Sequence, residues 1–515
     1  MNHMRKTILL FYGTLLYGAC LGQIASYNPP VFTDSLRTQK VQAALPVIEA
    51  LYKAYAKDRH FPGFAFGVVL DGKLLYSAGF GFAEVAKNVP ATPQSNFRIA
   101  SMSKSITAMA ILQLRDAGKL RLDNPAYLYI PELKNIKYLT TDAPPLTVRN
   151  LLTHGAGFPE DNPWGDRQLA DTDAELLQLI KSGVSFSNVP GIAYEYSNLG
   201  FALLGKIVSN VSRQPYQQYI TEHILKPLGM THTYWEYEKV PPAQLAHGYR
   251  WLNETWREEK LEHDGAYGAM GGLITTIEDF SKYMQLHMDA WPPRSGSESK
   301  VLKRSSLREM HQPWNFGELM PDYKFPDGRT CAIASAFAYG LGWLRDCAGR
   351  VMIGHSGGLP GFGSQWRFLP EYGIGVVSFA NLTYAGTGSV NLRVLDTLIA
   401  LAGLTPRTLP PSPVLQQRKG ELVKLLPDWN NAEKSGIFAE NFFSDYLIDS
   451  LRKEATTLFA GAGKIMRVRD VVPLNALRGS FVLEGERKNL EVIFTLTPEN
   501  PALIQEYHLR ELKKE

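Results

Sequence analysis

The stretch NFRIASMSKSITAMAILQL, residues 96–114, carries the main clue to the fold of this chain. Its second half repeats apolar residues at helical spacing, which predicts a buried helix that opens near Ser101. Ser101 and Lys104 stand at positions i and i+3, so they share one helix face and the amine can accept the hydroxyl proton. A serine at a helix start also has a free backbone N–H for a developing oxyanion.

The spacing alone does not identify a site, because S-x-x-K occurs three times in this chain. Ser297 and Lys300 lie in a polar stretch, and Ser450 and Lys453 lie in a small downstream unit. Ser101 is the member of the set that opens an apolar helix. The alternative is that Ser101 only caps the N-terminus of the helix and has no catalytic role.

A competing motif is GHSGG at residues 354–358, which matches the G-x-S-x-G nucleophile elbow. An elbow leads directly into a helix, but residues 359–363 read LPGFG, where proline and glycine oppose one. The elbow also needs a later histidine, and the one that follows is His508 in the last predicted strand. We therefore reject Ser356 as the nucleophile.

Two further motifs contain groups suited to the same chemistry. Tyr196-Ser197-Asn198 precedes a predicted helix, and His355-Ser356-Gly357 ends a predicted strand. A phenol beside an ammonium is pushed toward the phenolate and becomes a base, while an asparagine amide can hold a substrate carbonyl. The alternatives are a packed tyrosine, a capping asparagine and a strand-end histidine, and they remain open at this level.

Together and in this order, the motifs resemble those of the serine β-lactamase and penicillin-binding-protein superfamily, specifically its class C branch with related esterases and D-amino-acid peptidases. The resemblance covers about Val41 to Leu401. Further stretches typical of that branch lie at 146–158, 194–205, 227–230, 271–280 and 339–343. The resemblance implies an α+β fold, in which both ends of the segment form one antiparallel sheet flanked by helices, with the active site beneath a helical lobe.

The resemblance also implies roles for individual residues. Ser101 becomes the nucleophile, and Lys104 and Tyr196 become the proton-transfer pair. The residues that the resemblance assigns to substrate binding and the oxyanion hole are Asn198, His355, Ser356, Gly357 and Gly358. The backbone N–H groups of Ser101 and Gly358 would face the oxyanion.

One position departs from the class C pattern. Most class C β-lactamases begin the strand motif with lysine, whereas this chain has His355, which is mostly neutral near neutral pH. Efficient β-lactam hydrolysis is therefore in doubt. We expect a serine hydrolase that forms an acyl-enzyme with an amide or ester, such as a D-amino-acid peptide, a cell-wall fragment or a small ester. A β-lactamase proper and a slow-turnover penicillin-binding sensor or scaffold are the alternatives.

Composition and motif content exclude several other classes. The 54 Lys and Arg against 50 Asp and Glu leave a net charge of +4 on 515 residues, so no nucleic-acid partner is expected. The 11 histidines show no metal-ligand spacing, and no glycine-rich phosphate loop occurs. We expect no metal and no cofactor, only a small-molecule or peptide substrate. No pattern predicts an oligomeric state.

The proline-rich segment TPRTLPPSP, residues 405–413, predicts a linker. We expect a hydrolase domain over 27–404 and a small α+β unit over 414–515. In that unit, Ile437–Phe459 has apolar residues at helical spacing and four extended runs follow it. A helix on an antiparallel sheet is predicted, which resembles NTF2-like or cystatin-like modules.

The N-terminal residues 1–22 have the pattern of a signal peptide. Arg5 and Lys6 precede an apolar run that is too short to span a bilayer, and small residues follow near Gly22. We expect a periplasmic or secreted protein without a membrane span. A lipoprotein anchored at Cys20 is the alternative, although the usual leucine three positions earlier is absent.

Removal of the signal would leave Cys331 and Cys347 as the cysteines of the mature chain. An oxidising compartment allows two thiols to pair, and the segment between them is predicted to be extended chain that turns back. We expect a disulfide between these two residues. Two separate buried thiols are the alternative.

Overall fold

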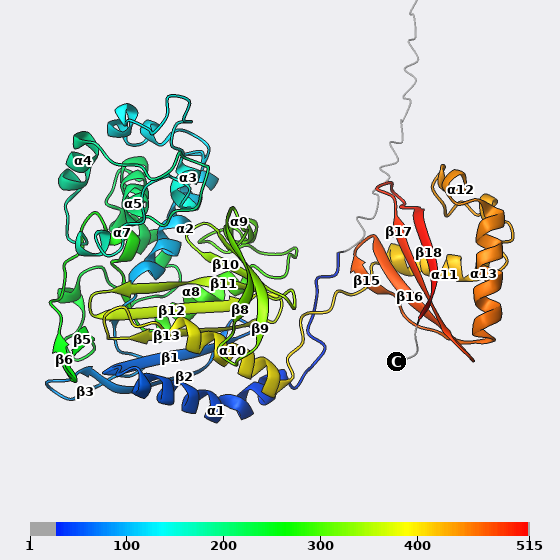
Figure 1. The fold of residues 1–515 in the computed structure, drawn as a ribbon, viewed down its shortest axis with the longest axis horizontal. Helices are drawn as coiled ribbons and strands as arrows, with labels where there is room; N and C mark the ends of the chain where they lie inside the picture. Colours follow the sequence, from blue (N-terminus) through cyan, green and yellow to red (C-terminus); the bar gives the residue numbers. More distant parts are fainter. Residues whose placement is uncertain (1–26, 513–515) are drawn as a thin grey trace, which may run out of the picture. The chain divides into compact units, whose positions relative to one another are not determined.

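The computed structural model describes residues 27–512, which form two compact units. The larger unit comprises Val31–Thr408, and the smaller one is built from Leu409 onward (Figure 1). The boundary between them falls inside the segment 405–413 that the sequence marks as a linker. The expected signal peptide 1–22, with Cys20, lies outside the described residues.

A nine-stranded antiparallel sheet forms the centre of the larger unit, in the order β3-β2-β1-β13-β12-β11-β10-β9-β8. The pairing of β1 with β13 joins strands from the two ends of this segment, as the family resemblance implies. The α+β fold class is therefore confirmed. The strands are β1 (Gly63–Leu70), β2 (Lys73–Glu84), β3 (Val89–Pro90), β8 (Asn315–Lys324), β9 (Thr330–Phe337), β10 (Gly342–Asp346), β11 (Val351–Leu359), β12 (Phe362–Leu369) and β13 (Ile374–Ala380).

Both faces of this sheet are buried, and alternating side chains enter two different cores. Val376 and Val377 are neighbours in β13, yet they belong to separate apolar clusters. One cluster includes α1 (Arg37–Asp58) and α10 (Gly388–Ala402), which pack against each other. The other includes α8 (Ile277–Asp289) and the helical lobe. This three-layer arrangement leaves the sheet rigid beneath the lobe.

The helical lobe follows the two-residue strand β4 (Phe97–Arg98), which pairs with β7 (Ile274–Thr275) near the lobe's other end. Figure 1 draws the lobe above the large sheet. Its helices are η1 (Ala100–Met102), α2 (Ser103–Asp116), α3 (Val148–Leu152), η4 (Gly165–Arg167), α4 (Asp173–Ser182), α5 (Asn198–Ser212), α6 (Tyr216–Ile220) and α7 (Gly268–Gly271). A hairpin of β5 (Tyr249–Leu252) and β6 (Thr255–Glu258), and the helix α9 (Arg304–Met310), complete the larger unit.

The smaller unit has helices and an antiparallel five-stranded sheet, which confirms the predicted helix-plus-sheet class. Alternate residues of its central strand, from Leu490 to Leu496, are buried against aromatic residues that include Trp429 and Phe442. Its elements are α11 (Pro413–Leu425), α12 (Phe442–Asp445), α13 (Ile448–Ala462), β14 (Ile465–Val468), β15 (Val472–Asn475), β16 (Arg478–Gly485), β17 (Asn489–Leu496) and β18 (Ile504–Leu512).

Two local features differ from the sequence pattern. The helical spacing over Ile437–Phe459 is divided into α12 and α13, which are separated at Tyr446 and Leu447. Pro413 belongs to α11 as its first residue, because the Ser412 hydroxyl caps the helix by accepting from the Leu415 N–H at 3.2 Å. The last proline of the linker sequence thus begins an ordered helix.

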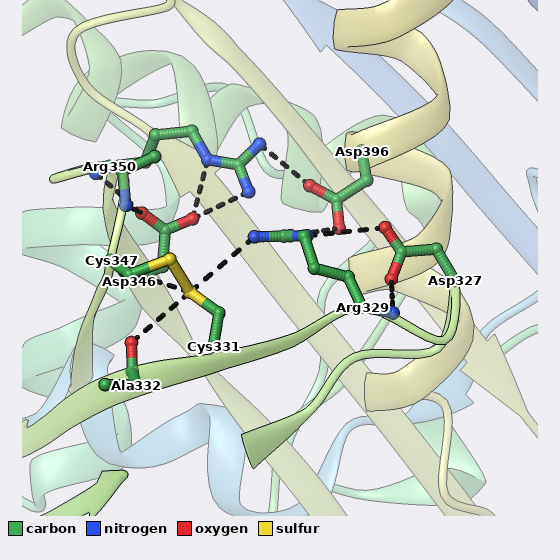
Figure 2. The surroundings of a disulfide bond; sticks show 9 residues. Asp327, Arg329, Cys331, Ala332, Asp346, Cys347, Arg350 and Asp396 are labelled. Atoms are coloured by element: carbon green, nitrogen blue, oxygen red, sulfur yellow. Dashed lines mark hydrogen bonds and ion pairs between the residues drawn. A yellow bond between two sulfur atoms is a disulfide. The ribbon is translucent and has the colours of Figure 1, made fainter. Parts of the chain in front are cut away.

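A disulfide joins Cys331 in β9 to Cys347 in the turn after β10, with their Cα atoms 5.9 Å apart. Figure 2 shows a charged cluster around this bond. Arg350 contacts Asp346 at 2.6 Å and Asp396 of α10 at 2.8 Å. The covalent link and the ion pairs therefore tie the turn between β10 and β11 to β9 and to α10.

Candidate active site

The structure places Ser101 and Lys104 in direct contact. Ser101 lies in η1, one turn before the body of α2, and the Lys104 amine donates to its Oγ at 3.0 Å. Ser101 is 7% exposed, whereas Lys104 is fully buried. The hydroxyl therefore faces the cleft while the amine stands behind it, which suits a nucleophile and its base.

Lys104 has two further acceptors, Asn198 Oδ1 at 2.7 Å and the Met270 carbonyl at 3.0 Å. Burial lowers the pKa of Lys104 to about 7, and the carboxylates of Asp166 and Asp161 act in the opposite direction. A substantial fraction of Lys104 is therefore a neutral amine near neutral pH, and a neutral amine can accept the Ser101 proton.

Tyr196 departs from the expectation that a neighbouring ammonium pushes it toward the phenolate. Burial raises the pKa of Tyr196 well above its ordinary value, and a hydrogen bond with Ser101 only partly offsets this. The Lys104 amine lies 4.9 Å from the centroid of the Tyr196 ring, so it faces the aromatic ring. That expectation is wrong: Tyr196 rests as a phenol, which can relay a proton but is not the resting base.

The N-terminus of α5 fixes Tyr196 and Asn198 in place. Ser197 caps this helix by accepting from the Gly200 N–H at 3.3 Å. The buried carboxylate of Asp161 accepts from the backbone N–H groups of Asn198 at 2.6 Å and Leu199 at 2.8 Å. Because a carboxylate at a helix N-terminus is stabilising, Asp161 holds the Tyr196–Asn198 turn against the cleft.

His355 faces the cleft from β11 and is 8% exposed. Its Nδ1 contacts the Ser356 carbonyl, and its Nε2 is buried without a hydrogen-bond partner among the described residues. Burial, together with the charge of Lys104, lowers the pKa of His355 to about 3. The imidazole is therefore neutral throughout the physiological range, with an unpartnered Nε2 lone pair beside the cleft.

The remaining residues of the strand motif lie along one edge of β11. β10 pairs only with Val351–Gly354 of this strand, so no strand of the described chain pairs with that edge from His355 to Gly358. Gly357 lets η1 approach, since a Cβ there would lie 3.1 Å from the Cβ of Ala100. Ser356 is exposed inside the strand, which turns directly into β12, so this serine has no strand-to-helix elbow.

A cavity of about 500 Å³ connects these groups. Ser101, Tyr196 and His355 open onto it, with Ser356 and Gly358 farther along β11. Lys104, Asn198 and Gly357 do not line it. The cavity walls also include Asn162, Asp166, Tyr194, Phe337, Arg367 and Tyr384. Five of the residues that the sequence singled out therefore line one cleft between the helical lobe and the sheet, and Lys104 and Asn198 are buried behind its wall.

No group of three or more His, Cys, Asp and Glu side chains among residues 27–512 is placed to hold a metal ion. No helix there is both long enough and apolar enough to cross a bilayer.

The family model described as Beta-lactamase matches residues 48–400 of this chain, which is more than half of its length. The chain belongs to the Beta-lactamase family. Protein flp of Staphylococcus aureus (strain MW2) is 29% identical over 337 residues, which cover 65% of this chain and 62% of that protein. The chain thus spans less than two thirds of the length of this relative.

Solved structures show the same Beta-lactamase family fold. The octameric penicillin-binding protein homologue from Pyrococcus abyssi matches with a TM-score of 0.58 at 22% identity, covering 91% of this chain and 96% of that chain. The penicillin binding protein from Bacillus halodurans matches with a TM-score of 0.53 at 24% identity, covering 68% of this chain and 98% of that chain. At these identities the likeness concerns the fold alone.

Sequence reasoning missed several residues that shape the site of this Beta-lactamase family chain. His154 accepts from the Ser197 N–H at 3.1 Å and packs on Tyr196 with ring centroids 4.2 Å apart. It lies in the stretch 146–158 that carried the family resemblance, which was the available signal. Asp161, Asp166 and Tyr384 had no such signal, because tertiary packing alone brings them to the cleft.

Proposed function

We propose that this protein is an exported serine hydrolase of the class C-like type, which acts on amides or esters through an acyl-enzyme. The observation that carries the proposal is the 3.0 Å hydrogen bond between Lys104 and Ser101, made by a lysine whose burial lowers its pKa to about 7. This arrangement supplies a nucleophile with its base at neutral pH.

In the proposed reaction, Ser101 Oγ attacks the substrate carbonyl carbon while its proton passes to Lys104. The negative charge that develops on the carbonyl oxygen is held by the backbone N–H groups of Ser101 and Gly358. The proton then passes through Tyr196 to the leaving amine or alcohol as its bond to the carbonyl carbon breaks. Water enters by the reverse proton path and releases the acid, and Ser101 regains its proton.

The neutral state of His355 supports esters and amides as substrates ahead of β-lactams. A neutral imidazole cannot replace a permanent ammonium in holding a substrate carboxylate, and a lost charge-assisted hydrogen bond costs about 1.5–3 kcal/mol. We therefore propose a D-amino-acid peptide, a cell-wall fragment or a small ester as substrate.

The proposal of export rests on the signal-like residues 1–22 and is supported by the bond between Cys331 and Cys347, since disulfides persist mainly outside the cytosol. We propose that the protein is periplasmic or secreted, and a lipoprotein anchored at Cys20 is the alternative. A direct check is the N-terminal sequence of the protein recovered after expression in a bacterial host: cleavage near Gly22 supports export, and an intact Met1 opposes it.

The test of the nucleophile is labelling with a fluorophosphonate, read by intact mass. The wild type should gain one adduct that maps to Ser101, and Ser101→Ala should gain none. Ser356→Ala serves as the matched control, because Ser356 lies on the same cleft wall and should not be required for the adduct. An adduct on Ser356, or one that persists in Ser101→Ala, would contradict the assignment.

The test of the substrate class compares nitrocefin, p-nitrophenyl esters and D-amino-acid anilides on the purified protein. Esters and anilides should be turned over faster than nitrocefin, and His355→Lys should shift the ratio toward nitrocefin by roughly ten- to a hundredfold. Faster hydrolysis of nitrocefin by the wild type would favour a β-lactamase proper. Stoichiometric acylation without turnover would favour a slow-turnover sensor.

A further inference from the structure

We propose that Asp166, together with Asn162 and Tyr384, forms a subsite for a protonated amine on the acyl part of the substrate. This inference rests on the proposed serine hydrolase function and names the substrate class of the same cleft. The substrate would be an amide or ester of an amino acid with a free α-amine, and the subsite would recognise its N-terminal residue.

Asp166 is held against Asn198, whose side-chain oxygen accepts from the Lys104 amine. It lies in η4, is 2% exposed, and accepts from the Asn198 amide at 3.4 Å. The close approach depends on Gly165, where an added Cβ would lie 2.8 Å from the Cβ of Asn198. Asp166 and Ser101 line the same cavity, so the acyl part of a substrate that Ser101 attacks would lie in the cavity that Asp166 borders.

The carboxylate of Asp166 forms no ion pair with any lysine, arginine or histidine among residues 27–512. Burial raises its pKa, although the charge of nearby Lys104 acts in the opposite direction. The Lys104 amine itself is bonded to Ser101, Asn198 and Met270. A buried carboxylate that has no ion-pair partner is costly, so a cation supplied by the substrate would add to the compensation that the charge of Lys104 gives.

The surrounding atoms suit an ammonium group, which donates three hydrogen bonds. Asp166 and Asn162 both line the cavity and provide side-chain oxygen acceptors. The Asn162 Oδ1 already orients toward this point, where it accepts from Asn198 Nδ2 at 2.5 Å. Tyr384 lines the same cavity and donates to Asp166 at 3.1 Å, so its hydroxyl oxygen retains acceptor capacity.

The contact between Asp166 and Tyr384 joins the helical lobe to the loop after β13. It lies beside Gly358, whose backbone N–H is proposed to bind the oxyanion. A Cβ on Gly358 would lie 3.0 Å from Tyr384 Cδ1, so the tyrosine ring lies directly on this glycine. A carboxylate favours a charged terminal α-amine over the uncharged, acylated amine of an internal residue.

The distribution of charged side chains along the cleft suits a positively charged substrate group. Among the described residues that line the cavity, Arg367 is the one arginine or lysine, and it pairs with Gly354 in the β11–β12 register. Gly354 is four residues from Gly358, or about 13 Å along an extended strand. The backbone of Arg367 therefore lies away from Gly358 and Tyr384, although the charges of Arg167 and Arg250 also act on Tyr384.

The experiment compares D-alanine p-nitroanilide with N-acetyl-D-alanine p-nitroanilide, which differ only in the charge and size of the amine. The wild type should favour the free amine by about ten- to a hundredfold in kcat/KM, the effect of one charge-assisted hydrogen bond. Asp166→Asn should bring the ratio close to one. Because both anilides use the same Ser101 and Lys104, a change in the Lys104 pKa cancels from the ratio.

The matched control is Asp142→Asn, which removes an exposed carboxylate outside the cavity lining and should keep the wild-type ratio. Tyr384→Phe provides a second variant, which removes one acceptor and should lower the ratio. A wild-type ratio near one, a preference for the acetylated anilide, or an unchanged ratio in Asp166→Asn would overturn the proposal. The wild-type ratio is measured on the unmodified protein, so this part of the test does not depend on whether a variant folds.

Hydrolysis of p-nitrophenyl acetate, which has no amine, separates this proposal from the proposed function. If ester hydrolysis persists in Ser101→Ala, the serine hydrolase function fails and the amine subsite fails with it. If the ester is hydrolysed in a Ser101-dependent manner while neither anilide is turned over, or both are turned over equally, the amine subsite alone is overturned.

Discussion

Burial acts on three groups around Ser101 in the same way, by disfavouring their charged forms. It lowers the pKa of Lys104 to about 7 and that of His355 to about 3, and it raises that of Tyr196. All three therefore tend toward neutrality in the resting site. Lys104 is therefore the base in the resting site, and Tyr196 is a neutral phenol that relays a proton.

The first prediction concerns the pH dependence of catalysis. Lys104 must be neutral to accept the Ser101 proton, so kcat/KM should be low below pH 7 and rise as the pH passes through about 7. His355, with a pKa of about 3, should add no second step in the neutral range. The measurement is kcat/KM for p-nitrophenyl acetate from about pH 5 to 9. A flat profile would exclude Lys104 as the titrating base.

The second prediction concerns Tyr196→Phe, which removes the relay hydroxyl and keeps the ring. Turnover should fall by roughly two to four powers of ten, the usual contribution of general acid–base catalysis. The ring contact with His154 should persist, so thermal stability should change little. Tyr194→Phe is the matched control, because Tyr194 lines the same cavity without a proposed catalytic role. Equal activity of both variants would contradict the proton path.

At this scale, the sequence predicts contacts that depend on local geometry. Ser101 and Lys104 were placed together because i and i+3 positions share a helix face. The protonation state of Tyr196 was predicted wrongly, because burial depends on residues from several segments. Asp161 contacts Asn198 across 37 positions, and Asp166 contacts it across 32, so no local pattern could identify them.

At the scale of elements, the β9–β10–β11 region supports the cleft from below. Within residues 27–512, one edge of β11 has no strand partner from His355 to Gly358, and the turn at the start of β11 is tied to β9 by the disulfide (Figure 2). The Arg350 guanidinium links the same turn to Asp396 of α10 at 2.8 Å. The position of the cleft strand therefore depends on covalent and ionic contacts at its far end.

The third prediction follows from that link. The disulfide closes a loop with a sequence separation of 16, which the chain-entropy model values at about 3 kcal/mol. Cys331→Ser combined with Cys347→Ser should lower the Tm by roughly 3 to 10 °C. Reduction of the wild type with dithiothreitol should lower it equally, while the variant should not respond. A wild-type Tm that is insensitive to the reductant would contradict the expected role of the bond.

The elements are predictable where turn and alternation signals are strong. Asp71-Gly72 lies between two extended runs, which favours the β1–β2 hairpin, and an apolar run spans the bounds of β13. β8 is hard to predict because Gly317, Pro321 and several charged residues give it a loop-like composition. Proline is tolerated there because β8 is an edge strand of the sheet.

At the scale of the whole molecule, the chain divides into units with separate cores. Phe64, Trp366 and Phe379 belong to the clusters of the larger unit, whereas Trp429 and Phe494 belong to a cluster built from the smaller unit alone. The larger unit ends with an ordered strap: Val31 and Thr408 exchange two backbone hydrogen bonds of 3.0 and 2.8 Å. Arg407 lies over the Phe32 ring, 4.4 Å from its centroid.

The last prediction uses this strap to separate the two units. A chain that ends at Thr408 keeps the three apolar clusters of the larger unit and the pairing with Val31, so it should fold and retain Ser101-dependent ester hydrolysis. A chain that ends at Leu404 loses three backbone hydrogen bonds and the Arg407 ring contact, or about 2–4 kcal/mol, so its Tm should be a few degrees lower than that of the first truncation. Thermal unfolding and hydrolysis of p-nitrophenyl acetate would be measured on both. An insoluble or inactive chain ending at Thr408 would mean that the hydrolase unit requires the smaller unit, despite their separate apolar cores.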